Sequence, residues 1–437
     1  MIGVGHPEGG RTTLLAPLTV IAGAVLVYAL LSRRLSGTVV TAPIFFAVIG
    51  LLVGPVLGLV DVGANEALLM GLLEAALVMV LFADAADMHL RHWTREPALS
   101  GRLLGIGLPL TMLAGAALAL LMVPGIQVWQ AALIGVILAP TDAALGQAVV
   151  ANPRVPAVIR NALNVESGLN DGLALPFVTI FLAVGVASTG AETELQVAQT
   201  LVLALGGSTA VGLAVGLGGG WLIRRAADAD TSGERWQSIA LIALAFGCFS
   251  IADGIGASGF LAVWVAGLAA GWTVRGHVRD EAFHLPEQVA DVLTAVGFLA
   301  LGAVLLVPVL AHATVTTVVY AAISLTVVRL LPVAISLART GMAPATVLYV
   351  GWFGPRGLAS IVFAGVVVEE AVPGDTEIAG VVLLTVAISL VVHGVTAAWG
   401  ARRYAAWFDR AAAADPTIPE AAKLPVASVH GRSTRRS

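Results

Sequence analysis

Apolar segments long enough to cross a lipid bilayer recur from one end of this sequence to the other. The hydrocarbon core of a bilayer is about 30 Å thick, so a spanning helix needs roughly 20 predominantly apolar residues. Only 11% of the residues are charged, whereas a soluble protein carries about a quarter. Such a chain cannot cover its surface with charge, and the sequence therefore predicts an all-α polytopic membrane protein.

The apolar runs and the charges between them predict a topology. About thirteen spans can be delimited, at residues 14–32, 37–60, 66–87, 101–123, 128–150, 157–183, 196–222, 237–253, 257–273, 286–311, 315–338, 344–370 and 376–401. Nearly all Lys and Arg residues fall in alternate loops, and the intervening loops carry Asp and Glu. Because basic loops remain in the cytoplasm, we expect a multi-pass protein of the plasma membrane, with its N-terminus outside and its C-terminus inside. Residues 410–437, rich in Ala, Pro, Ser and Arg, are predicted to form a short disordered cytoplasmic tail.

The fifth span contains a break with a carboxylate beside it, in the order Pro140, Thr141, Asp142. A proline lacks the backbone N–H of a regular helix and disturbs the preceding turn. Charged residues at bilayer depth cost about 2.5–3.5 kcal/mol on insertion scales, so those present need a reason. Interrupted helices at this depth line cavities, and their ends are natural ion sites. We therefore expect Asp142 to belong to an ion-binding site.

The sixth span carries a polar stripe made of Glu166, Ser167, Asn170 and Asp171. The i, i+4 spacing places Glu166 with Asn170 on one face of the helix, and Ser167 with Asp171 on the adjacent face. Oxygen ligands suit Na⁺, K⁺ or Li⁺, and a carboxylate can bind a proton instead. The stripe predicts a site at which a monovalent cation and a proton compete.

Two arginines lie at the same predicted depth as these acids. Arg329 in the eleventh span needs a buried anion, and we expect it to form a structural ion pair with Glu166. Arg356 in the twelfth span stands between glycines and a proline, which predicts a second broken helix with a positive charge at the break. The two breaks lie seven spans apart, as two inverted repeats of six helices would place them.

Three motifs together, Ala139-Pro-Thr-Asp142, Glu166-Ser-Gly-Leu-Asn-Asp171 and Gly354-Pro-Arg-Gly357, resemble the monovalent cation:proton antiporter-1 family, which includes NhaP-type sodium/proton antiporters. The resemblance covers about residues 14–405, as a sodium/proton exchanger membrane domain. It implies a homodimer with a mobile core bundle at about 101–183 and 315–401. The dimerisation side would comprise about 14–87 and 237–311, joined to the core by a linker helix at about 196–222.

The resemblance also implies roles for individual residues. Asp171 matches the essential aspartate that binds the ion or the proton. Asp142, Thr141 and Ser167 match its co-ligands. Asn170 matches the asparagine typical of electroneutral members, Glu166 and Arg329 match a structural ion pair, and Arg356 matches the arginine at the second break. Glu74 and Asp84 in the third span match only loosely an acidic position that some members use.

These observations predict a secondary antiporter, not an enzyme, that exchanges Na⁺ or another monovalent cation for H⁺ by alternating access. No cofactor and no nucleic-acid partner are expected, and the single cysteine excludes a disulfide within the chain. A K⁺/H⁺ antiporter would use the same ligands, so the ion stays open. Two alternatives of other classes are an ion channel, disfavoured because the sequence has no selectivity-filter repeat, and an intramembrane aspartyl protease, which needs two facing acids open to a peptide.

Overall fold

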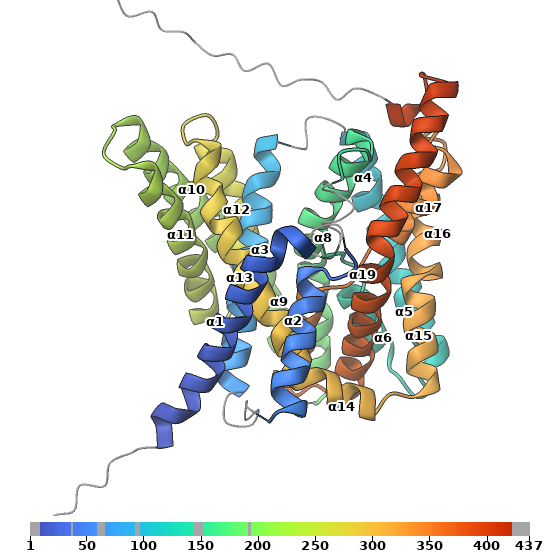
Figure 1. Ribbon diagram of the computed structural model, residues 1–437. Coiled ribbons are helices and arrows are strands. Elements are labelled where there is room, and N and C mark those ends of the chain that lie inside the picture. The colour runs from blue at the N-terminus through green and yellow to red at the C-terminus, as the bar shows by residue number, and fades with distance from the viewer. Residues whose placement is uncertain are drawn as a thin grey trace, which may run out of the picture.

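The computed structural model describes residues 9–35, 38–58, 66–91, 97–142, 145, 152–190 and 194–421. Over these residues the chain forms helices, turns and bends, without strands (Figure 1). Nine of the helices are long and apolar enough to cross a membrane, and four further apolar helices in the same described ranges are shorter. The protein is a polytopic α-helical membrane protein.

The helices follow the apolar runs of the sequence. The first half contains α1 (Gly9–Leu35), α2 (Ala42–Leu51), η1 (Leu52–Val56), α3 (Glu66–Arg91), α4 (Pro97–Arg102), η2 (Leu103–Gly107), α5 (Leu108–Met122), α6 (Val128–Ile137), α8 (Ala157–Ala187), α9 (Glu194–Leu201), η3 (Val202–Gly207) and α10 (Ser208–Asp228). The second half contains α11 (Glu234–Gly254), α12 (Gly259–Val274), η4 (Asp280–Phe283), α13 (His284–Ala300), η5 (Leu301–Leu305), α14 (Leu306–Ala311), α15 (Val315–Leu325), α16 (Val327–Ser336), α17 (Pro344–Trp352), α18 (Leu358–Glu369), α19 (Asp375–Ala414) and η6 (Pro419–Ala421).

The helices pack into two groups (Figure 1). The first bundle comprises α1–α3 and α10–α13, and the second bundle comprises α5, α6, α8 and α15–α19. Small residues let helices approach closely inside the first bundle, as is usual in membranes. A Cβ atom at Gly216 of α10 would collide with the backbone of α12, and one at Gly271 of α12 would collide with the backbone of α3. The two bundles meet where α3 and α12 contact α8.

Two helices of the second bundle are interrupted near their middle, at the two positions where the sequence predicts breaks. Helix α6 ends at Ile137 and residues 138–142 are not helical. Residues 143–144 and 146–150 of the predicted fifth span lie outside the described residues. Helix α17 ends at Trp352, residues 353–357 are not helical, and α18 begins at Leu358. The prolines explain both interruptions, because neither can donate a helical hydrogen bond.

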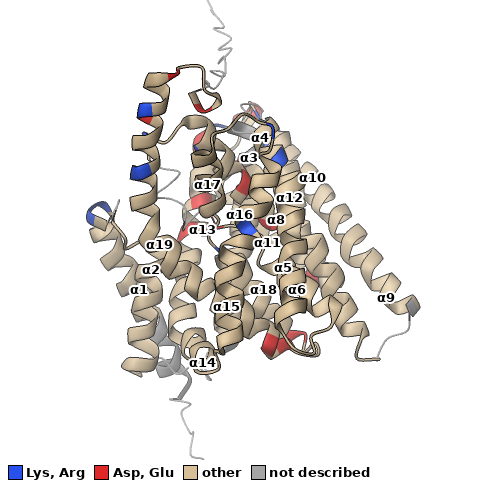
Figure 2. Cartoon of the chain, turned by 90° about the vertical axis from the view of Figure 1, so that its right-hand side faces the viewer, with Lys and Arg blue, Asp and Glu red and all other residues tan. Residues whose placement is uncertain are grey.

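Charge separates the two ends of the bundle. Figure 2 shows most of the described Lys and Arg residues toward the upper end, where some Asp and Glu residues also lie, whereas the charged residues at the lower end are Asp and Glu. We call the first the basic end; it carries Arg154, Arg224, Arg275 and Arg402. The opposite, acid-rich end carries Glu369, Glu370, Asp375 and Glu377.

The end of the chain differs from the predicted disorder between residues 410 and 421. Helix α19 continues to Ala414, and η6 packs back on the basic end. The Glu420 carboxylate is buried there and accepts hydrogen bonds from Ala343 N at 2.8 Å and Thr346 Oγ1 at 2.6 Å. The buried Glu420 carboxylate at the N-terminus of α17 favours this arrangement, and composition does not indicate such a contact. Residues 422–437 of the predicted tail lie outside the described residues.

Candidate functional site

The break after α6 leaves backbone carbonyls without helical hydrogen bonds, and side chains around the second break donate hydrogen bonds to them. The Arg356 guanidinium donates to Ala139 O at 2.7 Å and to Pro140 O at 3.1 Å. The Ser360 hydroxyl donates to Ile137 O at 2.7 Å. Arg356 has no solvent exposure, so its charge is balanced partly by these carbonyl dipoles. The arginine predicted at the second break therefore holds the two breaks together.

Asp142 connects the same two breaks from the other side. Its backbone N–H donates to Pro355 O at 2.8 Å, and its Oδ2 atom accepts from Leu358 N at 3.0 Å. The carboxylate thus caps the N-terminus of α18, where the helix dipole favours negative charge. A Cβ atom at Gly357 would overlap the Asp142 side chain, which explains why glycine precedes α18.

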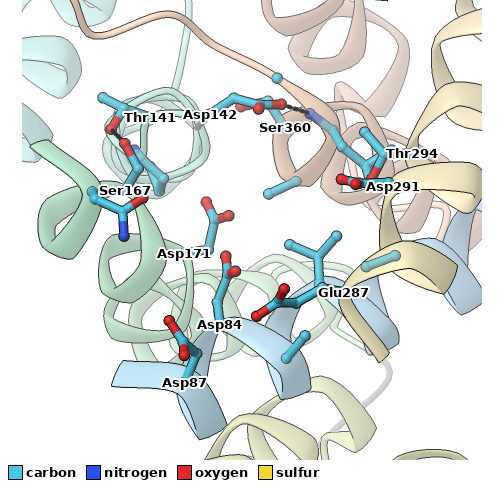
Figure 3. A pocket seen from close by; sticks show the side chains of 18 residues that line it. Asp84, Asp87, Thr141, Asp142, Ser167, Asp171, Glu287, Asp291, Thr294 and Ser360 are labelled. Carbon is cyan, nitrogen blue, oxygen red and sulfur yellow. Dashed lines mark hydrogen bonds between the residues drawn. The ribbon is translucent and has the colours of Figure 1, made fainter. Parts of the chain in front are cut away.

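The polar stripe of α8 faces the break after α6. Thr141 Oγ1 and Ser167 Oγ lie 3.0 Å apart, and Asn170 Nδ2 donates to Thr141 Oγ1 at 2.7 Å. Asn170 is buried, and its Oδ1 atom has no hydrogen-bond partner within the described part of the chain. Asp171 follows on α8 and lines a cavity with Asp142 (Figure 3). The structure brings together the five residues that the sequence predicts for the ion site.

Glu166 and Arg329 form the buried pair that the sequence predicts. Arg329 donates from Nη1 to Glu166 Oε1 at 2.5 Å and from Nη2 to Oε2 at 2.9 Å. Their side chains are 2% and 1% exposed. The bidentate geometry satisfies both carboxylate oxygens, and neither residue lines the cavity.

The cavity has a volume of about 430 Å³ and is rich in carboxylates. Its wall contains the six acidic residues Asp84, Asp87, Asp142, Asp171, Glu287 and Asp291. Polar neutral groups complete the wall, among them Asn164, Thr294 and Ser360. Figure 3 shows the side chains of Asp84 and Asp171 close to the centre of the cavity. Of the two acids that the sequence singles out in the third span, Asp84 lines the cavity and Glu74 does not.

Three of these carboxylates were missed in the sequence. Asp87 lies three residues after Asp84 on α3, and Glu287 and Asp291 lie four residues apart on α13. Both spacings place the acids on one helix face, which was the available signal. This signal is weak, because acids near span ends are also typical of residues exposed to water.

The cavity extends from the breaks toward the basic end of the bundle. Asp87 lies near the C-terminal end of α3, and Glu287 lies in the first turn of α13. The carboxylate and hydroxyl oxygen atoms that line the cavity suit a hard monovalent cation. Among the residues that the structure describes, His, Cys, Asp and Glu form no group of three or more that could hold a metal ion.

Comparison with known proteins assigns the chain to a family. The sequence matches the family described as "sodium/hydrogen exchanger, transmembrane" over residues 21–403. It is 26% identical to the K(+)/H(+) antiporter NhaP2 of Shewanella oneidensis, over 62% of this chain and 47% of that protein. It is 25% identical to the K(+)/H(+) antiporter NhaP of Alkalimonas amylolytica, over 89% of this chain and 67% of that protein. This chain thus spans about half the length of NhaP2.

The fold also matches a solved structure. The sodium proton antiporter MjNhaP1 of Methanocaldococcus jannaschii superposes with a TM-score of 0.71 and 19% sequence identity, over 90% of this chain and 99% of that one. At that identity the likeness concerns the fold. Together with the match over nearly the whole membrane region, it completes the assignment: the chain belongs to the sodium/hydrogen exchanger family, with NhaP-type antiporters among its relatives.

Proposed function

We propose that this protein is a secondary antiporter that exchanges Na⁺ or another monovalent cation for H⁺ across the plasma membrane. The observation that carries the proposal is the position of Asp171 and Asp142 at the inner end of an acidic cavity, beside two broken helices. A carboxylate at that place can hold a dehydrated cation or a proton, but not both. Mutual exclusion at one site suffices to couple the two fluxes.

The neighbouring residues have distinct roles in this proposal. Thr141 and Ser167 supply neutral oxygen ligands next to the carboxylates, and Asn170 orients the Thr141 hydroxyl through its 2.7 Å hydrogen bond. Asn170 matches the asparagine typical of electroneutral members of the family, and this resemblance supports exchange of one cation for one proton. Glu166 and Arg329 balance each other away from the cavity and serve structure.

The arrangement of helices supports alternating access. We infer about thirteen spans in two inverted repeats, with the basic end in the cytoplasm, the N-terminus outside and the C-terminus inside. In that orientation the acidic cavity opens to the cytoplasm. The second bundle then corresponds to the mobile core. The first bundle without α10 corresponds to the dimerisation side of a homodimer, and α9–α10 form the linker between the two.

The transported ion has two candidates. Relatives named K(+)/H(+) antiporters favour K⁺, whereas MjNhaP1 and a Na(+)/H(+) antiporter of Saccharomyces cerevisiae, 31% identical over 147 residues, favour Na⁺. The ligands named above serve either ion, because cavity size and the number of oxygens decide between them.

The test is cation-induced proton flux in everted vesicles from cells that lack their own antiporters. Na⁺, K⁺ and Li⁺ are added separately to vesicles with the wild-type chain, Asp171→Asn, Asp142→Asn, or the control Asp409→Asn, whose carboxylate is 52% exposed on the surface. We expect one cation to collapse the pH gradient in wild type and control and not in the two site variants. Equal flux in Asp171→Asn and wild type would refute the site, and current driven by voltage without proton exchange would indicate a channel.

A further inference from the structure

Two aromatic residues on α12 contact the second bundle directly beside the candidate site. Phe260 and Trp264 are four residues apart, so they lie on the same face of this helix. The Trp264 indole lies against Gly172 of α8, where a Cβ atom would overlap the ring. Gly172 is the residue that follows Asp171. An aromatic ring of the first bundle therefore packs against the backbone next to the proposed ion-binding carboxylate.

Phe260 makes the corresponding contact with the second broken helix. Its ring meets Phe363 of α18 edge to face, with centroids 6.3 Å apart, and Phe249 of α11 packs behind it at 5.3 Å. Phe363 is 2% exposed. The two aromatic residues thus close the contact of α12 with α8 and with α18, the two helices that carry the site.

These contacts lie on the side of the site away from the cavity mouth. Neither aromatic residue lines the cavity. Phe260 lies in the first turn of α12, and this helix ends at Val274, next to Arg275 of the basic end, so Phe260 lies at the end of α12 that is away from the basic end. Helix α18 runs from the break to Glu369 at the acid-rich end, and Phe363 lies in this half. The aromatic contacts therefore separate Asp171 from the acid-rich end.

The Trp264 indole N–H is left without an acceptor at this contact, within the part of the chain that the structure describes. Its Nε1 atom is buried and has no hydrogen-bond partner among the described residues. A buried donor without an acceptor is unfavourable, and buried indole N–H groups usually find one. Separation of α12 from α8 would admit water, which could accept this hydrogen bond. The closed arrangement is thus less stable than its apolar packing alone would make it.

We propose that Phe260 and Trp264 form an aromatic gate that closes the route from Asp171 to the acid-rich end while the cavity is open to the basic end. The gate deepens the proposed antiport, since it names residues that would prevent both routes from being open together. Its failure and that of the antiport proposal are separable, because access to position 171 can be measured without transport.

The first experiment measures that access with a membrane-impermeant thiol reagent applied from each side. The only cysteine, Cys248, is buried and is replaced by Ala. In this background, the thiol introduced by Asp171→Cys is expected to react from the basic end and slowly from the acid-rich end. Adding Trp264→Ala should raise the rate from the acid-rich end roughly tenfold or more. The control Trp272→Ala, on the same helix but 64% exposed, should not change it. Equal rates with Trp264→Ala and Trp272→Ala would overturn the gate.

The second experiment tests the contact itself by compensation, with the same labelling readout. Gly172→Ala places a methyl group in the indole, so the closed gate should be strained and labelling from the acid-rich end should rise. Trp264→Leu in the same chain makes room for that methyl group and should return the rate toward that of Trp264→Leu alone. Independent effects of the two substitutions would contradict a direct contact. If labelling follows these expectations and wild type moves no protons with any cation, the gate stands and the antiport proposal fails.

Discussion

The buried pair formed by Glu166 and Arg329 allows a quantitative test of its structural role, measured as its contribution to the free energy of unfolding. Both side chains are almost fully buried, and two hydrogen bonds join them. Removing one partner of such a pair leaves an uncompensated buried charge and costs about 3–5 kcal/mol. Replacing both partners by apolar side chains of similar volume is often neutral or stabilising.

We predict that a double-mutant cycle on Glu166 and Arg329 will measure a large coupling energy between the two side chains. Glu166→Met and Arg329→Met should each lower the free energy of unfolding by about 3–5 kcal/mol. The double variant should recover most of that loss, so that the coupling energy is at least about 3 kcal/mol. The nine tryptophans of the chain provide a fluorescence signal for unfolding of the purified protein in mixed micelles with increasing dodecyl sulfate.

A surface pair of the same chemistry provides the control. Arg154 and Asp409 lie 2.7 Å apart, but their side chains are 61% and 52% exposed. Exposed pairs contribute about 0.2–1 kcal/mol, so Arg154→Met should change stability by no more than that. The reasoning is refuted if Glu166→Met costs as little as Arg154→Met. It is also refuted if the double variant is as unstable as the sum of the two single variants.

Three further predictions concern the site and its surroundings. Gly357→Ala places a Cβ atom on the Asp142 carboxylate and should lower cation-dependent proton flux roughly tenfold or more, because it displaces a ligand. The control Gly380→Ala, which has open space around it, should leave the flux unchanged. Equal flux in the two variants would contradict this prediction. The apparent KM for the cation should rise as the pH falls, because protons and cations compete for Asp171. The rise should reach roughly tenfold per pH unit where Asp171 is mostly protonated. Initial transport rates at several pH values measure this KM, and a KM that does not depend on pH would exclude competition. Glu420→Gln should lower the free energy of unfolding by about 1–3 kcal/mol and leave the KM unchanged, and an altered KM would indicate that η6 acts on the site.

The breaks and the ion site were predictable because lipid tolerates few exceptions. Pro140 with Asp142, and Pro355 with Arg356, stand out in apolar spans since an unpaired charge or backbone group there is costly. The helical spacing of the α8 stripe was likewise enough to place Ser167 with Asp171 on one face. These residues are found by local rules, and the structure brings them together.

The carboxylates on α3 and α13 show where local rules stop. Asp87 and Glu287 come from spans far apart in the sequence and line one cavity because α3 and α13 pack together within the first bundle. A sequence shows an acid near the end of a span but not which helix faces it. Glu420 presents the same problem in reverse, because its burial depends on the N-terminus of α17, 77 residues earlier.

The contacts between the bundles are compatible with the proposed antiport, in which a rigid site would move against its neighbour. Within the second bundle, Arg356 and Ser360 donate hydrogen bonds across the two breaks, and the Asp142 carboxylate accepts one from Leu358 N. In the proposed antiport, these bonds should keep the ligand geometry as the bundle moves. Between α12 and the two site helices the contacts around Trp264 and Phe260 are apolar and aromatic. Such contacts have little directional preference and can break and re-form without leaving charges unpaired. Polar bonds that hold the site inside one bundle, with apolar and aromatic contacts from α12 beside it, are the division of forces that the proposed alternating access would use.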